Sequence, residues 1–169
     1  MDRAGERWIG RAGVAAGVLA VGAFVLGAGA PQKPPPTGLE LTMSANLTGE
    51  LDVMPHGRPF LAADGLRPGE RRTGAITVTN ITTERQLVRL RVSEQGPGAT
   101  DLDDAIAIDV KADGVQGFAD SLGGLRRWSS PGMSVAPGRT LKLRFSVVLR
   151  PTQAAYDGRS ESLLMELKS

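Results

Sequence analysis

The sequence of 169 residues contains no cysteine and a single histidine, His56. Without thiols, the chain has no disulfide framework, no cysteine-ligated zinc or iron–sulfur site and no thiol nucleophile. One imidazole also excludes His-rich metal sites, and a Ser–His hydrolase would have to use His56 as its base. We therefore expect a protein without enzymatic activity and without a resident cofactor.

Charge of one sign is also lacking. Lys and Arg together number 20 and Asp and Glu 18, which gives a formal net charge of +2. Charges this balanced do not create the extended positive field that attracts nucleic acids. We therefore expect no nucleic-acid partner.

Aromatic residues are scarce, at 4% of the chain, whereas there are 22 glycines and 11 prolines. This composition indicates many turns and an aliphatic core, as is typical of all-β domains.

The first thirty residues have the pattern of an export signal. Three arginines at positions 3, 7 and 11 precede the uncharged stretch 12–30, which ends in Ala28-Gly29-Ala30. A basic start, an apolar centre and an A-x-A end predict a signal peptide over 1–30 and hence a secreted or cell-surface protein. Pro31 after the expected cleavage point disfavours cleavage, and a helix over 12–30 at about 1.5 Å per residue nearly crosses a membrane. An uncleaved N-terminal membrane anchor is therefore the alternative, with membrane contact through 12–30 alone.

Residues 31–37 are rich in proline and predict an extended polyproline II spacer. From Gly38 onward, apolar and polar residues alternate with period two, which is typical of half-buried strands. The clearest alternating segments are 39–44, 75–79, 88–92, 106–111, 141–149 and 162–167. A weaker strand is expected over 47–53 and a short helical turn over 119–127. Residues 38–169 are thus predicted to form an antiparallel β-sandwich of the jelly-roll or immunoglobulin-like type.

Two similar segments precede predicted strands: Arg67-Pro68-Gly69-Glu70 and Ala136-Pro137-Gly138-Arg139. Proline fixes φ at the second position of a turn, and glycine accepts a positive φ at the third. Both segments therefore predict type II turns that lead into core strands.

The order of these features resembles the TasA/camelysin family of secreted bacterial biofilm-matrix proteins. The shared features after the signal segment are the strand 39–46, Leu66-x-Pro68-Gly69-Glu70, a strand ending in Asn80, Asp103-Asp104-Ala105-Ile106, Phe118-x-x-Ser121-Leu122, Pro137-Gly138 and Tyr156-x-Gly158-x-Ser160. The resemblance covers most of 38–169 and implies a jelly-roll-like sandwich that assembles into extracellular filaments. In such filaments the N-terminal strand of one subunit completes the sheet of the next.

The segment after the spacer supports assembly on physical grounds as well. A strand with one apolar face, following a flexible spacer, can pair with its own sheet or with the exposed edge of another subunit. Leu39, Leu41 and Met43 are the residues expected to anchor a donated strand. We therefore expect self-association into an oligomer or fibre, and the alternative is an ordinary first strand of the same sandwich.

An acidic cluster suggests a weak calcium site. Asp101, Asp103 and Asp104 lie close together in the sequence, and Ca²⁺ is bound by oxygen ligands that often come from loop carboxylates. The glycine and distal glutamate of a regular calcium loop are absent. A polar turn before a strand is the alternative interpretation.

A second function is suggested by basic residues near the only tryptophan after the export segment. Arg89, Arg91, Arg126, Arg127 and Trp128 are predicted to form a patch for an anionic cell-wall glycan. The chain would then be a membrane-tethered cell-surface binding module. Alternatively, Arg89 and Arg91 are the solvated face of a strand, opposite carboxylates such as Asp109.

Overall fold

The computed structural model describes residues 38–94, 102–151 and 156–169. These residues form ten β-strands and one short 3-10 helix: β1 (Leu39–Thr48), β2 (Leu51–Met54), β3 (Leu61–Leu66), β4 (Arg71–Asn80), β5 (Gln86–Glu94), β6 (Ile106–Ala112), β7 (Val115–Ser121), η2 (Leu122–Arg126), β8 (Met133–Val135), β9 (Thr140–Leu149) and β10 (Ser160–Lys168). The predicted all-β class is confirmed. The expected signal or anchor helix over 1–30 and the spacer over 31–37 lie outside the described residues. Among the residues that the structure describes, no helix has the length and hydropathy needed to cross a membrane.

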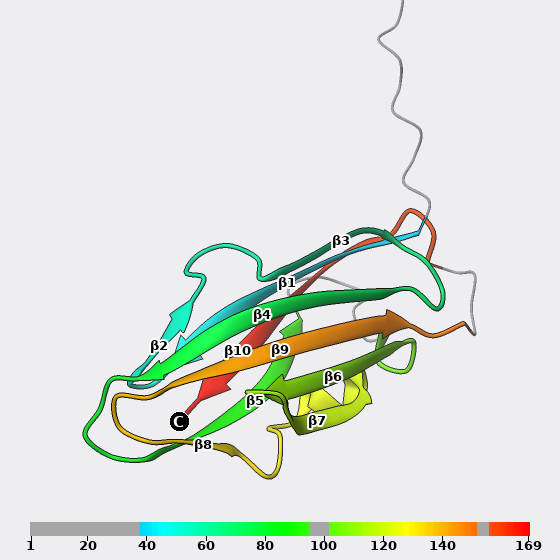
Figure 1. Cartoon of the computed structure of the whole chain (residues 1–169). Helices are drawn as coiled ribbons and strands as arrows, with labels where there is room; N and C mark the ends of the chain where they lie inside the picture. Colours follow the sequence, from blue (N-terminus) through cyan, green and yellow to red (C-terminus); the bar gives the residue numbers. More distant parts are fainter. Residues whose placement is uncertain (1–37, 95–101, 152–155) are drawn as a thin grey trace, which may run out of the picture. The chain divides into compact units, whose positions relative to one another are not determined.

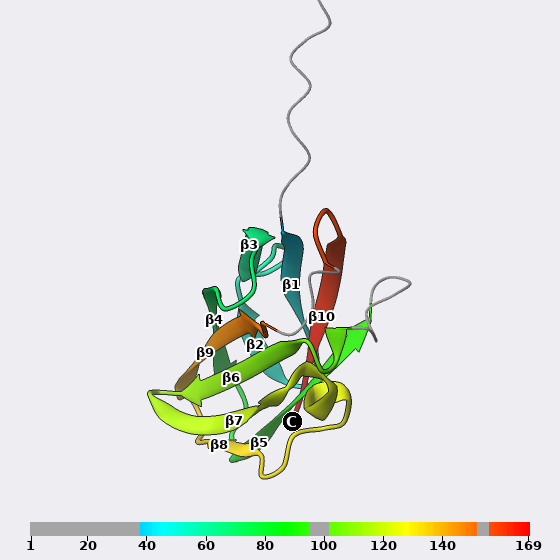
Figure 2. The same cartoon turned by 90° about the vertical axis from the view of Figure 1, so that its right-hand side faces the viewer.

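The strands form two five-stranded sheets. The first sheet has the order β3-β1-β10-β5-β8 and the second has the order β2-β4-β9-β6-β7. In Figure 1, β4, β9 and β6 lie in front of β1, β10 and β5, and Figure 2 shows the two layers from the side. The predicted β-sandwich is thus confirmed at this level.

One pairing corrects the expectation of an antiparallel sandwich. β1 and β10 run parallel, in a register that extends from Glu40↔Ser160 to Thr48↔Lys168. The other ladders are antiparallel. Because β1 and β10 are far apart in the sequence, no tight hairpin joins them and their relative direction is not fixed by a local turn.

The strands with clear alternation were predicted, and three weaker ones were not. The six alternating segments correspond to β1, β4, β5, β6, β9 and β10, and the segment 47–53 is divided at Gly49 between β1 and β2. β3, β7 and β8 were missed. β7 has little buried surface on either face and β8 has three residues, so neither carries a strong period-two pattern. The expected helical turn is shorter than 119–127 and forms as η2.

The core lies between the sheets and is largely aliphatic. The alternating residues of β9 (Leu141, Leu143, Phe145, Val147 and Leu149) are buried, as are Ile76 and Val78 of β4 and Leu163, Met165 and Leu167 of β10. The rings of Phe60 and Phe145 lie with their centroids 4.7 Å apart. Removal of this apolar surface from water is the main force that holds the layers together.

Both Pro-Gly turns have the predicted geometry. Gly69 has φ +82° and Gly138 has φ +65°, and in each turn the N–H of the fourth residue donates to the carbonyl of the first, at 2.9 and 3.1 Å. The N–H of Gly69 also donates to the carbonyl of Leu149, and that of Gly138 to the carbonyl of Asn80. The first turn therefore leads into β4 and binds the last residue of β9. The second turn leads into β9 and binds the last residue of β4.

Candidate functional site

The predicted donor strand is seated in its own sheet. β1 is bordered by β10 from Glu40 to Thr48 on one side and by β3 from Leu39 to Met43 on the other, so its first half is paired on both backbone edges. Leu39, Leu41 and Met43 are 0%, 1% and 0% exposed and belong to the core. Within a single chain, β1 is therefore an ordinary first strand of the sandwich, which is the alternative to a donated strand.

The start of β1 is held by the turn before β10. The N–H of Gly158 donates to the carbonyl of Gly38 at 3.0 Å, and the N–H of Glu40 donates to the carbonyl of Arg159 at 2.8 Å. Gly38 adopts φ +110°, and a Cβ at this position would lie 2.7 Å from the carbonyl carbon of Gly65. Only glycine fits here, because both the backbone conformation and the close approach of β3 exclude a side chain.

Side chains of the same turn form a small polar cluster. The guanidinium of Arg159 donates to Glu161 Oε1 at 2.8 Å and lies 5.4 Å from the ring centroid of Tyr156. Glu161 and Tyr156 are both buried, with 7% and 6% exposure. A buried carboxylate requires a partner of this kind, and its pairing fixes the turn that holds the start of β1.

The predicted arginine patch is divided between two groups of contacts. On the outer face of the first sheet, Arg91 forms an ion pair with Glu166 of β10, and its guanidinium carbon lies 4.6 Å from the ring centroid of Trp128. Lys168 Nζ lies at the same distance from that centroid. The carboxylate opposite β5 is therefore Glu166, and not Asp109 as expected, because β6 belongs to the other sheet.

This ion pair perturbs the carboxyl of Glu166. The hydrogen bond from Arg91 is the largest cause that lowers the pKa of Glu166 below its usual value of 4.5, and a hydrogen bond from Ser93 adds to the effect. Both stabilise the charged form.

The remaining arginines of the predicted patch have different surroundings. Arg126 forms an ion pair with Asp103, with an Nη2–Oδ1 distance of 2.7 Å. Arg89 and Arg127 are exposed, and neither forms an ion pair within the described ranges. The patch therefore presents fewer unpaired charges than the sequence suggests.

The predicted calcium cluster is only partly described. Asp101 lies outside the described residues, Asp104 is exposed, and Asp103 is already paired with Arg126. In the part of the chain that the structure describes, no three acidic or histidine side chains gather as a metal site would require. His56 lies in an exposed loop, where its Nε2 is 3.0 Å from Oδ1 of Asp52.

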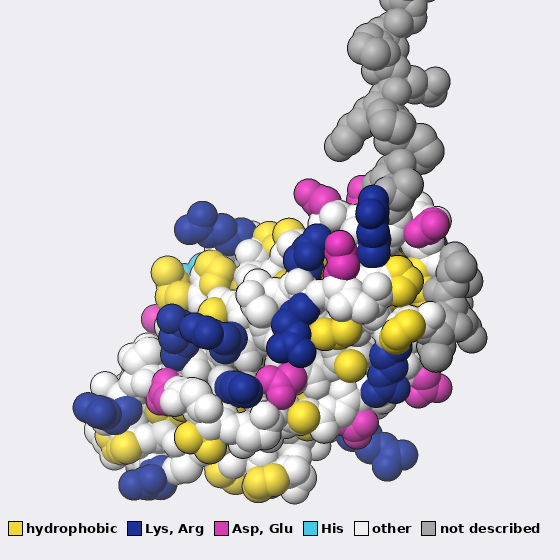
Figure 3. Space-filling model, turned by 45° about the vertical axis from the view of Figure 1, so that its right-hand side comes forward, with side chains coloured by type: hydrophobic (Ala, Val, Ile, Leu, Met, Phe, Trp, Pro, Cys, Tyr) yellow, Lys and Arg dark blue, Asp and Glu magenta, His cyan; other side chains and the backbone are white. Residues whose placement is uncertain are grey.

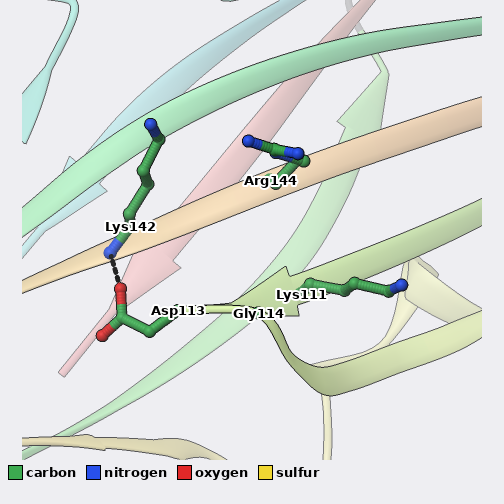
Figure 4. A pocket seen from close by; sticks show the side chains of 5 residues that line it. All are labelled: Lys111, Asp113, Gly114, Lys142 and Arg144. Carbon is green, nitrogen blue, oxygen red and sulfur yellow. Dashed lines mark hydrogen bonds between the residues drawn. The ribbon is translucent and has the colours of Figure 1, made fainter.

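Sequence reasoning missed a basic cluster on the second sheet. Lys111, Lys142 and Arg144 line a recess of about 270 Å³ beside the turn at Asp113-Gly114 (Figure 4). Both turn residues have positive φ, +48° and +88°, as a two-residue type I′ hairpin requires. The Asp-Gly pair that follows an alternating segment is typical of such a hairpin, and it could have predicted β7 from the sequence.

Comparison with known proteins gives no family for this chain. No family model matches it, and no curated protein matches it. Among solved structures, it is similar to the ASH / PapD-like domain of human CEP192 (PapD-like domain 7), with 12% identity and a TM-score of 0.28, over 82% of this chain and 88% of that one.

Proposed function

We propose that this chain is an exported, non-enzymatic structural protein of a bacterial cell surface, and that it forms or joins extracellular fibres by exchange of β1 between copies. The observation that carries the proposal is the position of β1, which is the first strand of the described residues and lies between β3 and β10, and not beside β2, the strand that follows it.

The surroundings of β1 are those of a strand that another copy can replace. Without β1, the first sheet would have a gap between β3 and β10. Its walls would be apolar: Leu61, Ala63 and Leu66 of β3, and Leu163, Met165 and Leu167 of β10, all of which are buried. A second copy has the identical strand, so it can make the same backbone ladder and fill the same core positions.

The connections of β1 also favour exchange. Consecutive strands usually pair with each other, but β1 pairs with β3 and β10, whereas β2 belongs to the other sheet. If β1 leaves its sheet, the chain continues from Gly49 into β2, which can keep its own pairing with β4 in the other sheet. Gly49 has φ +126°, a conformation that allows a sharp change of chain direction.

Exchange of this kind produces open assemblies. Each copy gives one strand and receives one, so the contact joins two different surfaces. Such a contact builds an open filament unless the rotation between successive subunits closes a ring. Because β1 is seated in the isolated chain, it must first leave its own core. We therefore expect assembly to be slow and to accelerate under conditions that destabilise the sandwich.

A reversible lock on β1 tests the proposal. Thr42 and Ser162 are Cα partners in the β1–β10 ladder, and the natural chain has no cysteine to interfere. The double variant Thr42→Cys/Ser162→Cys, oxidised as a monomer, is expected to remain monomeric by light scattering and electron microscopy. Reduction is expected to restore fibre formation.

The matched control places the lock elsewhere. Thr79 and Thr140 are Cα partners in β4 and β9, with their hydroxyl oxygens 3.0 Å apart. Thr79→Cys/Thr140→Cys restrains the second sheet and leaves β1 free, so it is expected to assemble in both redox states. Equal assembly of the β1-locked protein in both states, or a persistent monomer in every variant, would contradict the proposal.

A further inference from the structure

The outer face of the second sheet carries a cluster of basic residues that has no role in exchange of β1. Lys142 and Arg144 point outward from β9, and Lys111 points outward from the neighbouring β6. β1 belongs to the other sheet, so this face is left unchanged when β1 moves. Figure 3 shows Lys and Arg side chains standing out from this side of the sandwich, with Asp and Glu side chains among them.

Like charges lie directly opposite each other in this cluster. Lys111 and Arg144 are Cα partners in the β6–β9 ladder, an arrangement that destabilises a sheet when nothing neutralises it. Lys142 adds a third positive charge two residues from Arg144, on the same face of β9. Across residues 38–94, 102–151 and 156–169, none of the three forms an ion pair with an acidic side chain.

The nearby acidic residues offset these charges only in part. Asp113 Oδ1 accepts a hydrogen bond from the backbone N–H of Lys142 at 3.0 Å, and this bond ties the β6–β7 turn to β9 (Figure 4). Asp109 faces outward from β6, but its Cα partner is Ser146, and it forms no ion pair within the described part of the chain. Three basic groups thus stand beside two carboxylates, neither of which is paired with them.

The shape of the cluster suits an extended ligand. The Cα partners of Lys142 and Arg144 on β4 are Thr77 and Ala75. Because these two side chains are short, the basic side chains extend over them. Figure 4 shows Lys142 and Arg144 extending on the side of β9 next to β4, whereas Lys111 extends along β6. Their charged ends therefore spread over the surface and do not converge on one point. Spacings of roughly 7 Å along a strand and about 4.8 Å between strands suit charges repeated along a chain.

We propose that this face, made by Lys111, Lys142 and Arg144, binds a linear polyanion that carries repeated phosphate groups. The guanidinium of Arg144 can make paired hydrogen bonds with one phosphate, and the two ammonium groups can neutralise its neighbours. Binding releases counterions, so the affinity falls as salt rises. In a fibre, each subunit presents the same face, and repeated copies bind one polymer with increased avidity.

The test uses the full chain, purified in mild detergent, with inorganic polyphosphate as the probe and orthophosphate as a comparison that has a single phosphate group. Binding is measured by isothermal titration calorimetry over a series of salt concentrations. With three contacts, a log–log plot of affinity against salt is expected to have a slope of about −2, and in the variant Lys142→Gln/Arg144→Gln a slope of about −0.7. Orthophosphate is expected to bind far more weakly, because it engages one site instead of three.

A charge-matched control separates this face from general electrostatic attraction. Arg58→Gln/Arg85→Gln removes the same charge from exposed positions in the β2–β3 and β4–β5 connections, outside the cluster, and is expected to keep the slope of the unmodified chain. Equal losses in the two double variants, or no binding of polyphosphate by the unmodified chain, would overturn the proposal.

A gain in affinity provides a test that loss of folding cannot imitate. Asp109→Asn removes the unpaired carboxylate on β6 beside the cluster and is expected to tighten polyphosphate binding several-fold at low salt. Unchanged or weakened binding in a variant with an unaltered far-UV circular dichroism spectrum would count against this face as the site.

Discussion

Gly38 is the residue at which the chain enters the sandwich, and its environment leads to a sharp prediction. Its φ of +110° strains any other residue, and a Cβ would lie 2.7 to 2.9 Å from backbone atoms of Gly65 and Leu66. Gly38→Ala is therefore expected to lower the free energy of unfolding by more than about 2 kcal/mol, because the clash with β3 adds to the backbone strain. Urea denaturation of the purified chain measures this loss.

Gly57 provides the matched control. It also has a positive φ, +63°, but no atom lies within 4 Å of the place a Cβ would occupy. Gly57→Ala should therefore cost only the backbone strain, about 1–2 kcal/mol. If the two substitutions cost the same, the close approach between Gly38 and β3 is not a constraint on how β1 is seated.

Glu166, on the outer face of the first sheet, is expected to make the free energy of unfolding depend on pH. Because Arg91 and Ser93 lower the pKa of Glu166 in the folded chain, its charged form stabilises the fold above its usual value of 4.5. That contribution is lost as pH falls through the lowered pKa, where the folded carboxyl becomes protonated. Glu166→Gln is therefore expected to destabilise the protein at pH 7, and its difference from the unmodified chain is expected to shrink as pH falls below 4.5 and the carboxyl becomes protonated.

The measurement is the free energy of unfolding of both proteins across that pH range. Asp64→Asn, which removes an exposed carboxylate from β3, is the control for the loss of one negative charge. A Glu166→Gln effect that stayed constant down to the lowest pH would show that the ion pair with Arg91 does not contribute.

Individual residues illustrate what the sequence can and cannot reveal. Alternation correctly predicts that Leu39, Leu41 and Met43 point into the core, because the period of a strand is a local property. It does not identify Glu166 as the partner of Arg91, because the two residues lie far apart in the sequence and meet only through the order of strands. The same limit hid the cluster of Lys111 with Arg144, which only the β6–β9 register brings together.

At the scale of single elements, β1 is expected to contribute strongly to the stability of the isolated chain. Leu41 is 1% exposed in the core, so Leu41→Ala should cost about 2–5 kcal/mol, the range for loss of a buried leucine. Thr42 lies on the opposite face of the same strand, and Thr42→Ala should cost about 1 kcal/mol or less. Thermal unfolding followed by circular dichroism compares the two variants.

The result distinguishes a seated strand from a free one. A small effect of Leu41→Ala, equal to that of Thr42→Ala, would mean that β1 is detached in solution and does not complete its own sheet.

Elements differ in how well the sequence predicts them, and the reason is their exposure. β9 and β10 bury every second side chain over most of their length, so their patterns are strong. β7 lies at an edge, and much of it, including Val115 at 71% exposure, faces solvent, so little hydrophobic periodicity marks it. The parallel direction of β1 relative to β10 has no local signal at all, since no hairpin joins them.

At the scale of the whole molecule, the sandwich has two surfaces with separate proposed roles. The first sheet contains β1 and would join one copy to the next, whereas the outer face of the second sheet would bind a polyanion. A fibre built by the first surface leaves the second exposed on every subunit. The export segment over 1–30 would bring such an assembly to the cell surface, which remains a prediction from the sequence.

The most direct measurement of β1 exchange mixes two single-cysteine chains, one carrying Thr42→Cys and the other Ser162→Cys. These positions face each other in the β1–β10 ladder, so a disulfide between different chains forms when β1 of one copy lies against β10 of another. A mixture of Thr42→Cys with Thr140→Cys, on the other sheet, controls for random collision. We predict intermolecular disulfides in the first mixture as fibres grow and none in the control, whereas fibres without this cross-link, or chains that never assemble, would contradict strand exchange.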